Sequence, residues 1–258
     1  RASLPYLGFN TLSAVKEANS GSLKNYKVLY SNLYSKDIAN LKAFWAKRGF
    51  KPVFKQVTDD EAFLAQGDLV VSENSPTVAQ ILEWMMLWSD NLLADRLAGL
   101  AARAAGYSPN IKGIETIFRT LLTQLEIDDS KLVVADASGL SKKNKITAKL
   151  MGELLYKIRI DQKYALLYNS LPVGGVSGTL QSRFTTTAPS AVGLVRAKTG
   201  TLNGTATLAG YVQSTDREYV FVTLADDIAK GNAALNKARA AIDRVLGRLA
   251  APTIPAEI

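Results

Sequence analysis

The 258-residue chain contains no histidine and no cysteine. Without histidine there can be no Ser-His-Asp triad, and without cysteine there can be no Cys-His pair, thiolate zinc site or disulfide framework. Any nucleophilic chemistry must therefore use a hydroxyl group that is activated by an amine or a carboxylate. The absence of cysteine is also compatible with secretion.

Long apolar runs are missing as well. No stretch reaches the ~18 consecutive apolar residues of a membrane span, so the sequence predicts no transmembrane segment. The first residues, Arg1-Ala2-Ser3-Leu4-Pro5, lack the apolar centre of a signal peptide, and we expect either a removed export signal or an internal start. The 47% of hydrophobic residues is nevertheless sufficient for a buried core.

Positive charge is in excess, with 31 basic against 23 acidic residues and a net charge of +8. A nucleic-acid site would require basic residues clustered beside stacking aromatics, and no segment has that pattern. The densest basic run, Lys142-Lys143-Asn144-Lys145, is typical of a solvated loop. We therefore expect no nucleic-acid partner, although a general attraction to anionic surfaces such as cell-wall polymers fits the charge.

The N-terminal region has weak patterning. Residues 1–37, with the polar patch Asn19-Ser20-Gly21-Ser22-Leu23-Lys24, are interpreted as a linker or the remnant of a preceding region. The main domain is predicted to cover residues 38–258 and to begin with a helix at 38–48 and a strand at 52–57. A second strand is predicted at residues 68–71.

Helices dominate the middle of the chain. Ser75 and Pro76 are predicted to be the N-cap and first turn of a helix that continues into Ser89-Asp90-Asn91. A second helix is predicted from about Leu92 to near Gly106, with Asp90 as its cap, and further helices at 111–125 and 147–158. The Ser89-Asp90-Asn91 triplet thus lies between two helices.

The C-terminal third changes to strand patterning at residues 193–201, 207–214 and 218–225. A helix is predicted after Gly231, and its buried face is predicted to consist of Leu235, Ala238, Ile242, Val245 and Leu249. Three antiparallel strands, a C-terminal helix packed on them and a mostly helical region together predict an α+β fold.

Two polar segments of this fold could carry amide hydrolysis, which needs a nucleophile, a proton shuttle and oxyanion donors. In this scheme Ser89 relays a proton, and Asn91 hydrogen-bonds an amide of the substrate. Lys198 and the hydroxyl groups of Thr199 and Thr201 bind a terminal carboxylate, and the Thr201 N–H is one oxyanion donor. Gly200 leaves room for a peptide to add to the strand edge.

The segment Lys198-Thr199-Gly200-Thr201, downstream of Ser89-Asp90-Asn91, resembles the class C low-molecular-mass penicillin-binding proteins, the D-alanyl-D-alanine carboxypeptidase/endopeptidase family. Two more segments are similar to motifs of that family, Asp136-Ala137-Ser138-Gly139-Leu140-Ser141 and Gly178-Thr179-Leu180 with Arg183. The resemblance spans roughly residues 38–249. It implies a β-lactamase/transpeptidase-like fold, an extracytoplasmic location, peptidoglycan stem peptides and β-lactams as partners, and no metal or organic cofactor.

The family's Ser-x-x-Lys nucleophile is the element for which this chain has no good match. Ser13-Ala14-Val15-Lys16 is the only literal match, and its flanks do not continue as an apolar helix that would hold a nucleophile. The sequence therefore favours a chain that lacks the segment carrying the nucleophile.

Three alternatives to a serine D-Ala-D-Ala peptidase remain, and the third of them is a generic basic scaffold. The first is a catalytically silent module that binds stem peptides through Asn91 and the Lys198 strand. The second is a β-lactamase, which would need a carboxylate to activate water. Glu126 and Asp128-Asp129 lie at a plausible interval after Ser89, but their pattern is that of surface acids near a turn.

Overall fold

The computed structural model describes residues 27–30, 38–39, 42–43, 46–47, 53–56 and 76–251. The chain forms two compact units, Arg1–Ser75 and Pro76–Ile258. The boundary that the sequence suggested at residue 38 stays a prediction. Ser13, Lys16 and the predicted strand at 68–71 lie outside the described residues.

In the first unit, strand β1 (Lys27–Tyr30) pairs in parallel with β2 (Val53–Gln56), with Lys27 opposite Val53. Strand β2 confirms the strand predicted at 52–57, whereas no strand was predicted at β1. The described residues of the predicted 38–48 helix are helical at Ile38, Ala39, Lys42, Ala43 and Ala46.

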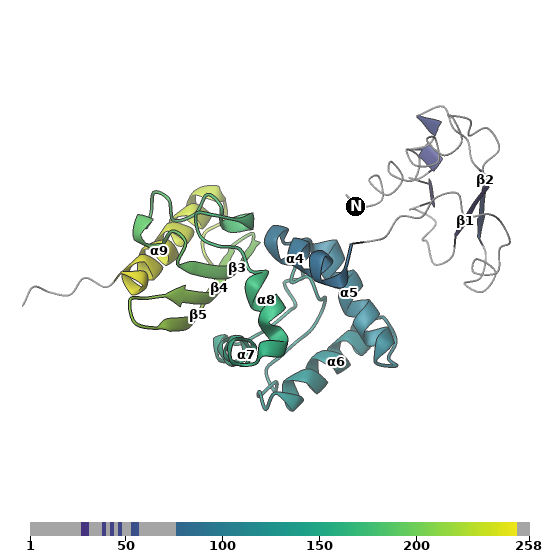
Figure 1. The fold of residues 1–258 in the computed structure, drawn as a ribbon, viewed down its shortest axis with the longest axis horizontal. Helices are drawn as coiled ribbons and strands as arrows, with labels where there is room; N and C mark the ends of the chain where they lie inside the picture. The colour runs from purple at the N-terminus through teal and green to yellow at the C-terminus, as the bar shows by residue number, and fades with distance from the viewer. Residues whose placement is uncertain are drawn as a thin grey trace, which may run out of the picture. The chain divides into compact units, whose positions relative to one another are not determined.

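The second unit consists of a helical part followed by a sheet and a last helix (Figure 1). The helices before the sheet are α4 (Val78–Trp88), α5 (Asn91–Ala104), α6 (Ile111–Gln124), α7 (Ala148–Ile160) and α8 (Ala165–Asn169). The sheet is formed by β3 (Val195–Leu202), β4 (Thr205–Gln213) and β5 (Glu218–Ala225), and α9 (Asn232–Ala250) follows it. This arrangement confirms the predicted α+β class.

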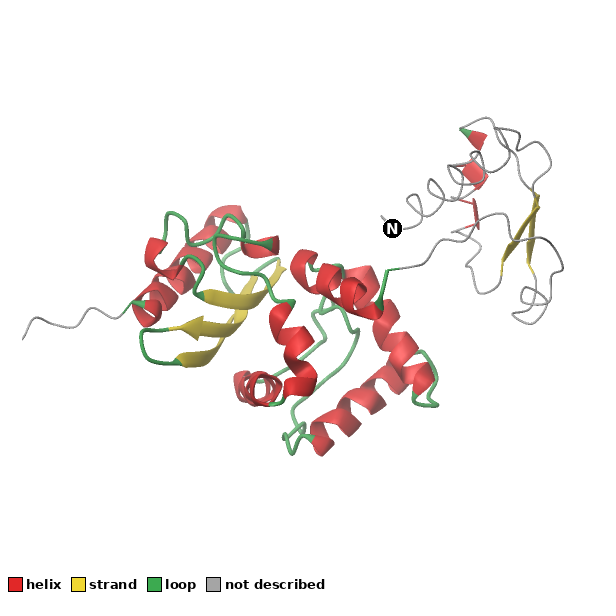
Figure 2. Ribbon diagram, in the orientation of Figure 1, coloured by secondary structure: helices red, strands yellow, loops and turns green. Residues whose placement is uncertain are grey.

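The sheet is antiparallel in the order β3-β4-β5, so β3 is an edge strand. Helix α9 packs on one of its faces, as Figure 2 shows, and α7 packs on the other. On the α9 face, the main core joins the helix to alternate residues of the strands; its members include Val195, Ala197, Leu208, Val212, Ile242 and Leu246. On the opposite face, Tyr211 packs with Leu155 and Leu171 and donates its hydroxyl to the Leu155 carbonyl at 2.7 Å.

Two details of the predicted helices were wrong. Helix α4 is capped by Thr77 rather than Ser75, because the Thr77 hydroxyl accepts from the Gln80 N–H and the Gln80 side chain accepts from the Thr77 N–H. On α9, Val245 is 60% and Leu249 38% exposed. The buried side of that helix is instead formed by Leu235, Ile242, Asp243, Leu246, Gly247 and Ala250.

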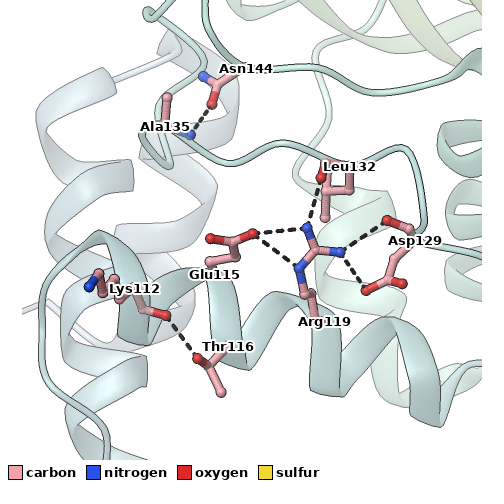
Figure 3. A network of polar contacts seen from close by, with 8 residues as sticks. All are labelled: Lys112, Glu115, Thr116, Arg119, Asp129, Leu132, Ala135 and Asn144. Atoms are coloured by element: carbon pink, nitrogen blue, oxygen red, sulfur yellow. Dashed lines mark hydrogen bonds and ion pairs between the residues drawn. The ribbon is translucent and has the colours of Figure 1, made fainter.

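Arg119 on α6 holds the loop that follows that helix (Figure 3). Its guanidinium donates to Glu115, to the side chain and carbonyl of Asp129 and to the Leu132 carbonyl, at 2.8–3.1 Å. Because five guanidinium donors lie in one plane, a single arginine can fix both a neighbouring helical turn and a loop. Arg119 therefore anchors the loop after α6 to α6 itself.

Within the part of the chain that the structure describes, no helix combines the length and apolar character needed to cross a bilayer.

Candidate active site

Ser89 ends helix α4 in a backbone conformation that is unusual for a residue with a side chain. Its φ and ψ are 57° and 51°, in the left-handed region, and its N–H donates to the Met85 carbonyl. Such a conformation costs a non-glycine residue ~1–3 kcal/mol and persists only where its surroundings enforce it. The next residue, Asp90, accepts from the Leu93 N–H at 3.0 Å and caps α5, as predicted. Two helix ends thus hold the Ser89 hydroxyl at a sharp bend.

The Lys198 side chain reaches this bend from strand β3. Its Nζ donates to Ser89 Oγ at 2.6 Å and to the Thr199 carbonyl at 3.1 Å. The structure therefore brings Ser89 and Lys198 together across 109 positions of sequence. An ammonium group has three donors, so one N–H of Lys198 remains for a bound ligand.

Burial lowers the pKa of the Lys198 amine from its ordinary value of 10.5. Desolvation has this effect because it disfavours the charged form. A lysine with a depressed pKa can exchange a proton with a hydroxyl group more readily than an exposed lysine can. The pair of Lys198 and Ser89 is thus suited to proton transfer in a protein without histidine.

Thr199, Gly200 and Thr201 lie on the free edge of the sheet. The edge is covered at its start, where the Ala197 N–H donates to the Pro172 carbonyl at 2.9 Å. Backbone groups alternate in direction along a strand, so those of Thr199 and Thr201 also point to this edge. Beyond Ala197 no backbone group of this edge bonds to another backbone group among the described residues, and the Thr199 carbonyl accepts only from the Lys198 side chain, so the edge is open to an added peptide strand.

The side chains of the same residues alternate between the two faces of the sheet. Thr199 and Thr201 lie on the α9 face, where Thr199 shares a 3.0 Å hydrogen bond with Thr179. Thr201 Oγ1 accepts from the Arg239 guanidinium at 2.9 Å. A Cβ at Gly200 would lie 2.3 Å from Thr207 Oγ1, so a larger residue there would displace Thr207.

Asn91, the first residue of α5, lies two positions after Ser89 and is half-buried. Its side-chain amide makes no hydrogen bond within the described part of the chain, which leaves donors and an acceptor for a ligand. The predicted roles of Asn91, Thr199, Gly200 and Thr201 stay predictions. Sequence reasoning did not place Arg239 beside Thr201, because no local motif links these two positions.

Comparison with known proteins identifies the family to which this site belongs. The model of the D-Ala-D-Ala carboxypeptidase 3 (S13) family matches residues 26–249. The chain belongs to this family. The predicted resemblance to the D-alanyl-D-alanine carboxypeptidases is thereby confirmed.

Two relatives show what share of a family member's length this chain covers. It is 35% identical over 188 residues to Carboxypeptidase DacB of Mycolicibacterium smegmatis, covering 71% of this chain and 40% of that protein. It is 31% identical over 169 residues to D-alanyl-D-alanine carboxypeptidase DacB of Haemophilus influenzae, covering 65% of this chain and 35% of the relative. The chain therefore spans less than half the length of these relatives.

Solved structures agree with the S13 assignment. The crystal structure of penicillin binding protein 4 (dacB) from Haemophilus influenzae is similar with a TM-score of 0.66 and 26% identity, over 81% of this chain and 47% of that one. The same protein complexed with a β-lactam gives a TM-score of 0.65, with 26% identity over 81% of this chain and 49% of that one.

The segment at residues 136–141 forms a tight loop that is hydrogen-bonded to α5. Asp95 accepts from the N–H groups of Ala137 and Ser138, both at 2.9 Å. Asp136 accepts from Gly139, Ser141 and Asn144 at 2.6–2.7 Å. Burial raises the pKa of the Asp136 carboxyl, but these hydrogen bonds outweigh burial and leave the pKa lowered. Asp136 therefore remains ionised and keeps the loop in place.

The acids considered for a β-lactamase mechanism are engaged elsewhere. Glu126 is 88% exposed at its side chain and lies 3.8 Å from Lys157, whereas Asp129 pairs with Arg119 at 3.0 Å. Asp128 accepts from the Ser130 N–H in the same turn. These contacts agree with the predicted surface acids near a turn and give no support to a water-activating carboxylate.

Gly178 fits closely against the end of α4. Its φ is +54°, and a Cβ at this position would lie 2.4 Å from the Leu87 carbonyl oxygen. Gly178→Ala should therefore lower the free energy of unfolding by about 2 kcal/mol or more, because strain and a backbone clash add. It should also disturb Ser89, two residues beyond Leu87. Urea unfolding measures the first effect, and β-lactam binding measures the second.

Gly106→Ala is a matched control, since Gly106 has a φ of +83° and a Cβ added there would meet nothing within 4 Å. It carries only the conformational strain, so its loss of stability should be smaller and its β-lactam binding unchanged. Equal effects of both substitutions would contradict the close fit of Gly178 to α4.

The depressed pKa of Lys198 predicts a pH dependence of stability. Below its folded-state pKa the amine is charged in both states, and the cost of burying the charge is present in full. As the pH rises from that pKa toward 10.5, the folded state has released its proton while the unfolded state has not. The free energy of unfolding of the wild type should therefore rise relative to Lys198→Met in this window. Urea unfolding of both proteins at several pH values measures the difference, and parallel curves would contradict the buried amine.

Proposed function

We propose that this protein acts in serine-type cleavage of D-Ala-D-Ala bonds or peptide cross-bridges in peptidoglycan, and that this chain supplies the Ser89, Asn91 and Lys198 part of the site. The observation that carries the proposal is the 2.6 Å hydrogen bond from Lys198 Nζ to Ser89 Oγ. Membership of the S13 family and the names of the curated relatives support the same substrate class.

The proposed chemistry gives separate roles to Ser89, Asn91 and the edge of β3. Ser89, whose oxygen accepts from Lys198, has its own proton free to pass toward the leaving amine. Asn91 hydrogen-bonds a peptide amide of the substrate. The edge of β3 binds the peptide as an added strand, and the Thr201 N–H is a donor for the developing oxyanion.

β-Lactams are the expected inhibitors of this chemistry. The β-lactam complex of penicillin binding protein 4 from Haemophilus influenzae supports this expectation, because that protein is similar over 81% of the chain. Since the proposed substrate is a cell-wall polymer, we infer that the protein works outside the cytoplasm, in the periplasm or as a secreted protein.

The decisive experiment treats the full chain with a fluorescent penicillin and maps any modified serine by mass spectrometry. A covalent adduct on a serine, together with release of D-Ala from an N-acetylated peptide that ends in D-Ala-D-Ala, would support the enzyme and identify the nucleophile for which the sequence has no good match. Adduct formation should be slowed by Ser89→Gly, which removes the hydroxyl and relieves the left-handed backbone. Reversible, salt-sensitive peptide binding without an adduct would overturn the enzyme and favour the silent peptidoglycan-binding module.

A further inference from the structure

Helix α9 has an outer face whose charged side chains are all positive. Its exposed cations are Lys237, Arg244 and Arg248, and the only acid of the helix, Asp243, is buried. At 3.6 residues per turn the three cations project within about 40° of one another, on the side of the helix opposite the buried Leu246. They form a straight row about 17 Å long, which we call the cation stripe.

The cation stripe has no counter-charge among the residues that the structure describes. None of its three side chains makes a hydrogen bond or ion pair with any of them. Asp243 cannot supply the missing charge, because its carboxylate pairs with Arg183 on the inner side of the helix. The stripe is thus a local surface of positive potential, distinct from the general charge of +8, and it attracts a partner of negative charge.

Apolar side chains accompany the stripe along one flank of α9. Val245 and Leu249 each follow a stripe cation directly in the sequence, and they are 60% and 38% exposed. At about 100° per residue, this apolar flank projects between the stripe and the buried side of the helix. A dissolved polyanion leaves such side chains in water, whereas a lipid surface binds cations at its headgroups and apolar side chains just beneath them. The pairing of stripe and flank therefore favours a lipid bilayer with anionic headgroups.

The position of α9 keeps this face apart from Ser89 and Lys198. Ala197 belongs to the core between the sheet and α9, and successive residues of a strand project to opposite faces, so Lys198 lies on the face away from α9. The stripe points away from the same core on the other side. A molecule that rests on a bilayer through α9 therefore holds the Ser89–Lys198 pair on the side of the sheet that faces away from the lipid.

We propose that the outer face of α9, meaning the cation stripe and its apolar flank, binds the surface of a membrane that contains anionic phospholipids. The cations contact lipid phosphates, and the flank enters the boundary between headgroups and acyl chains. Each Lys or Arg at such a surface strengthens binding by about fivefold, so the three together contribute about 100-fold. The inference goes beyond the proposed function and does not depend on it, because lipid binding uses no group of the active site.

The experiment sediments the full chain with sucrose-loaded vesicles of equal parts phosphatidylglycerol and phosphatidylcholine, and with vesicles of phosphatidylcholine alone. The stripe variant is Lys237→Gln/Arg244→Gln/Arg248→Gln. Its matched control removes the same charge from three exposed side chains of the helical part, Arg103→Gln/Lys112→Gln/Lys131→Gln. We expect the stripe variant to bind the anionic vesicles about 100-fold more weakly than the wild type, and the control to bind within about threefold of it.

A second variant, Val245→Gln/Leu249→Gln, tests the apolar flank. Glutamine retains a high helix propensity, and urea unfolding checks that each variant stays folded. This variant should bind the anionic vesicles about 10-fold more weakly and should bind inorganic polyphosphate as the wild type does.

Equal vesicle binding by the stripe variant and its control would overturn the proposal, because net charge alone would then explain the attraction. Unchanged vesicle binding by the flank variant would overturn the lipid surface in favour of a dissolved polyanion. The proposal is also wrong if the wild type does not bind anionic vesicles or binds both kinds of vesicle equally. None of these results affects the proposed function, which is tested by the penicillin adduct and by release of D-Ala.

Discussion

Lys198→Met should reduce the rate of serine acylation by a labelled penicillin by about 100-fold or more. Methionine retains most of the length and apolar packing of lysine but has no donor for Ser89 Oγ, which Lys198 contacts at 2.6 Å. Ser89 Oγ then has no donor to replace the proton that Ser89 passes to the leaving group. The measurement is the second-order acylation rate constant for wild type and variant.

The result separates a chemical role from a structural one. Because Lys198 carries the cost of a partly desolvated amine, the methionine variant should be at least as stable as the wild type, and unfolding cannot explain the loss. Lys131→Met, which removes an exposed lysine, should acylate at the wild-type rate. An unchanged rate in Lys198→Met would contradict the proton-transfer role. If the wild type forms no adduct, this chain has no working nucleophile of its own, and the same variants are compared by peptide affinity.

Local signals were enough to predict the elements that present Ser89 and Lys198. Asp90 is a residue type that favours helix N-caps, which correctly indicated a second helix at the end of the triplet, although α5 begins at Asn91 rather than at Leu92. β-Branched and aromatic residues at alternating positions correctly indicated the three strands. The contact between the two segments was predicted only through the combination of motifs, since no periodicity links positions 109 residues apart.

The rest of the site depends on tertiary packing, which is invisible in local sequence. The apolar spacing of α9 predicted Val245 and Leu249 as buried. The helix is instead rotated about its axis so that Asp243 faces the core and is buried. A buried aspartate is stable only with partners, and its partners Arg183 and Thr187 lie 60 and 56 residues earlier in the chain. The same rotation places Arg239 against Thr201. For this reason the contact between α9 and β3 could not be predicted from helix periodicity.

Arg183→Met should destabilise the second unit by about 3–5 kcal/mol, because it leaves the carboxylate of Asp243 buried without its cation. The side chains of Arg183 and Asp243 are only 13% and 4% exposed. Thr187 still donates to Asp243 at 3.0 Å, but a single neutral hydrogen bond does not compensate a buried charge. Urea unfolding at neutral pH measures the loss.

The double variant Arg183→Met/Asp243→Leu should recover most of that stability, since two apolar side chains replace a buried ion pair of similar volume. Arg217→Met is the surface control, because Arg217 and Asp216 form a 2.6 Å pair with side chains 64% and 57% exposed, and its loss should change stability little. Additive effects of the two core substitutions would contradict a coupled buried pair.

Arg183 also donates to the Arg239 carbonyl, so it fixes the turn of α9 that faces Thr201. Even a folded Arg183→Met chain should therefore bind the D-Ala-D-Ala peptide less tightly than the wild type does, because Thr201 belongs to the strand edge proposed to bind the peptide.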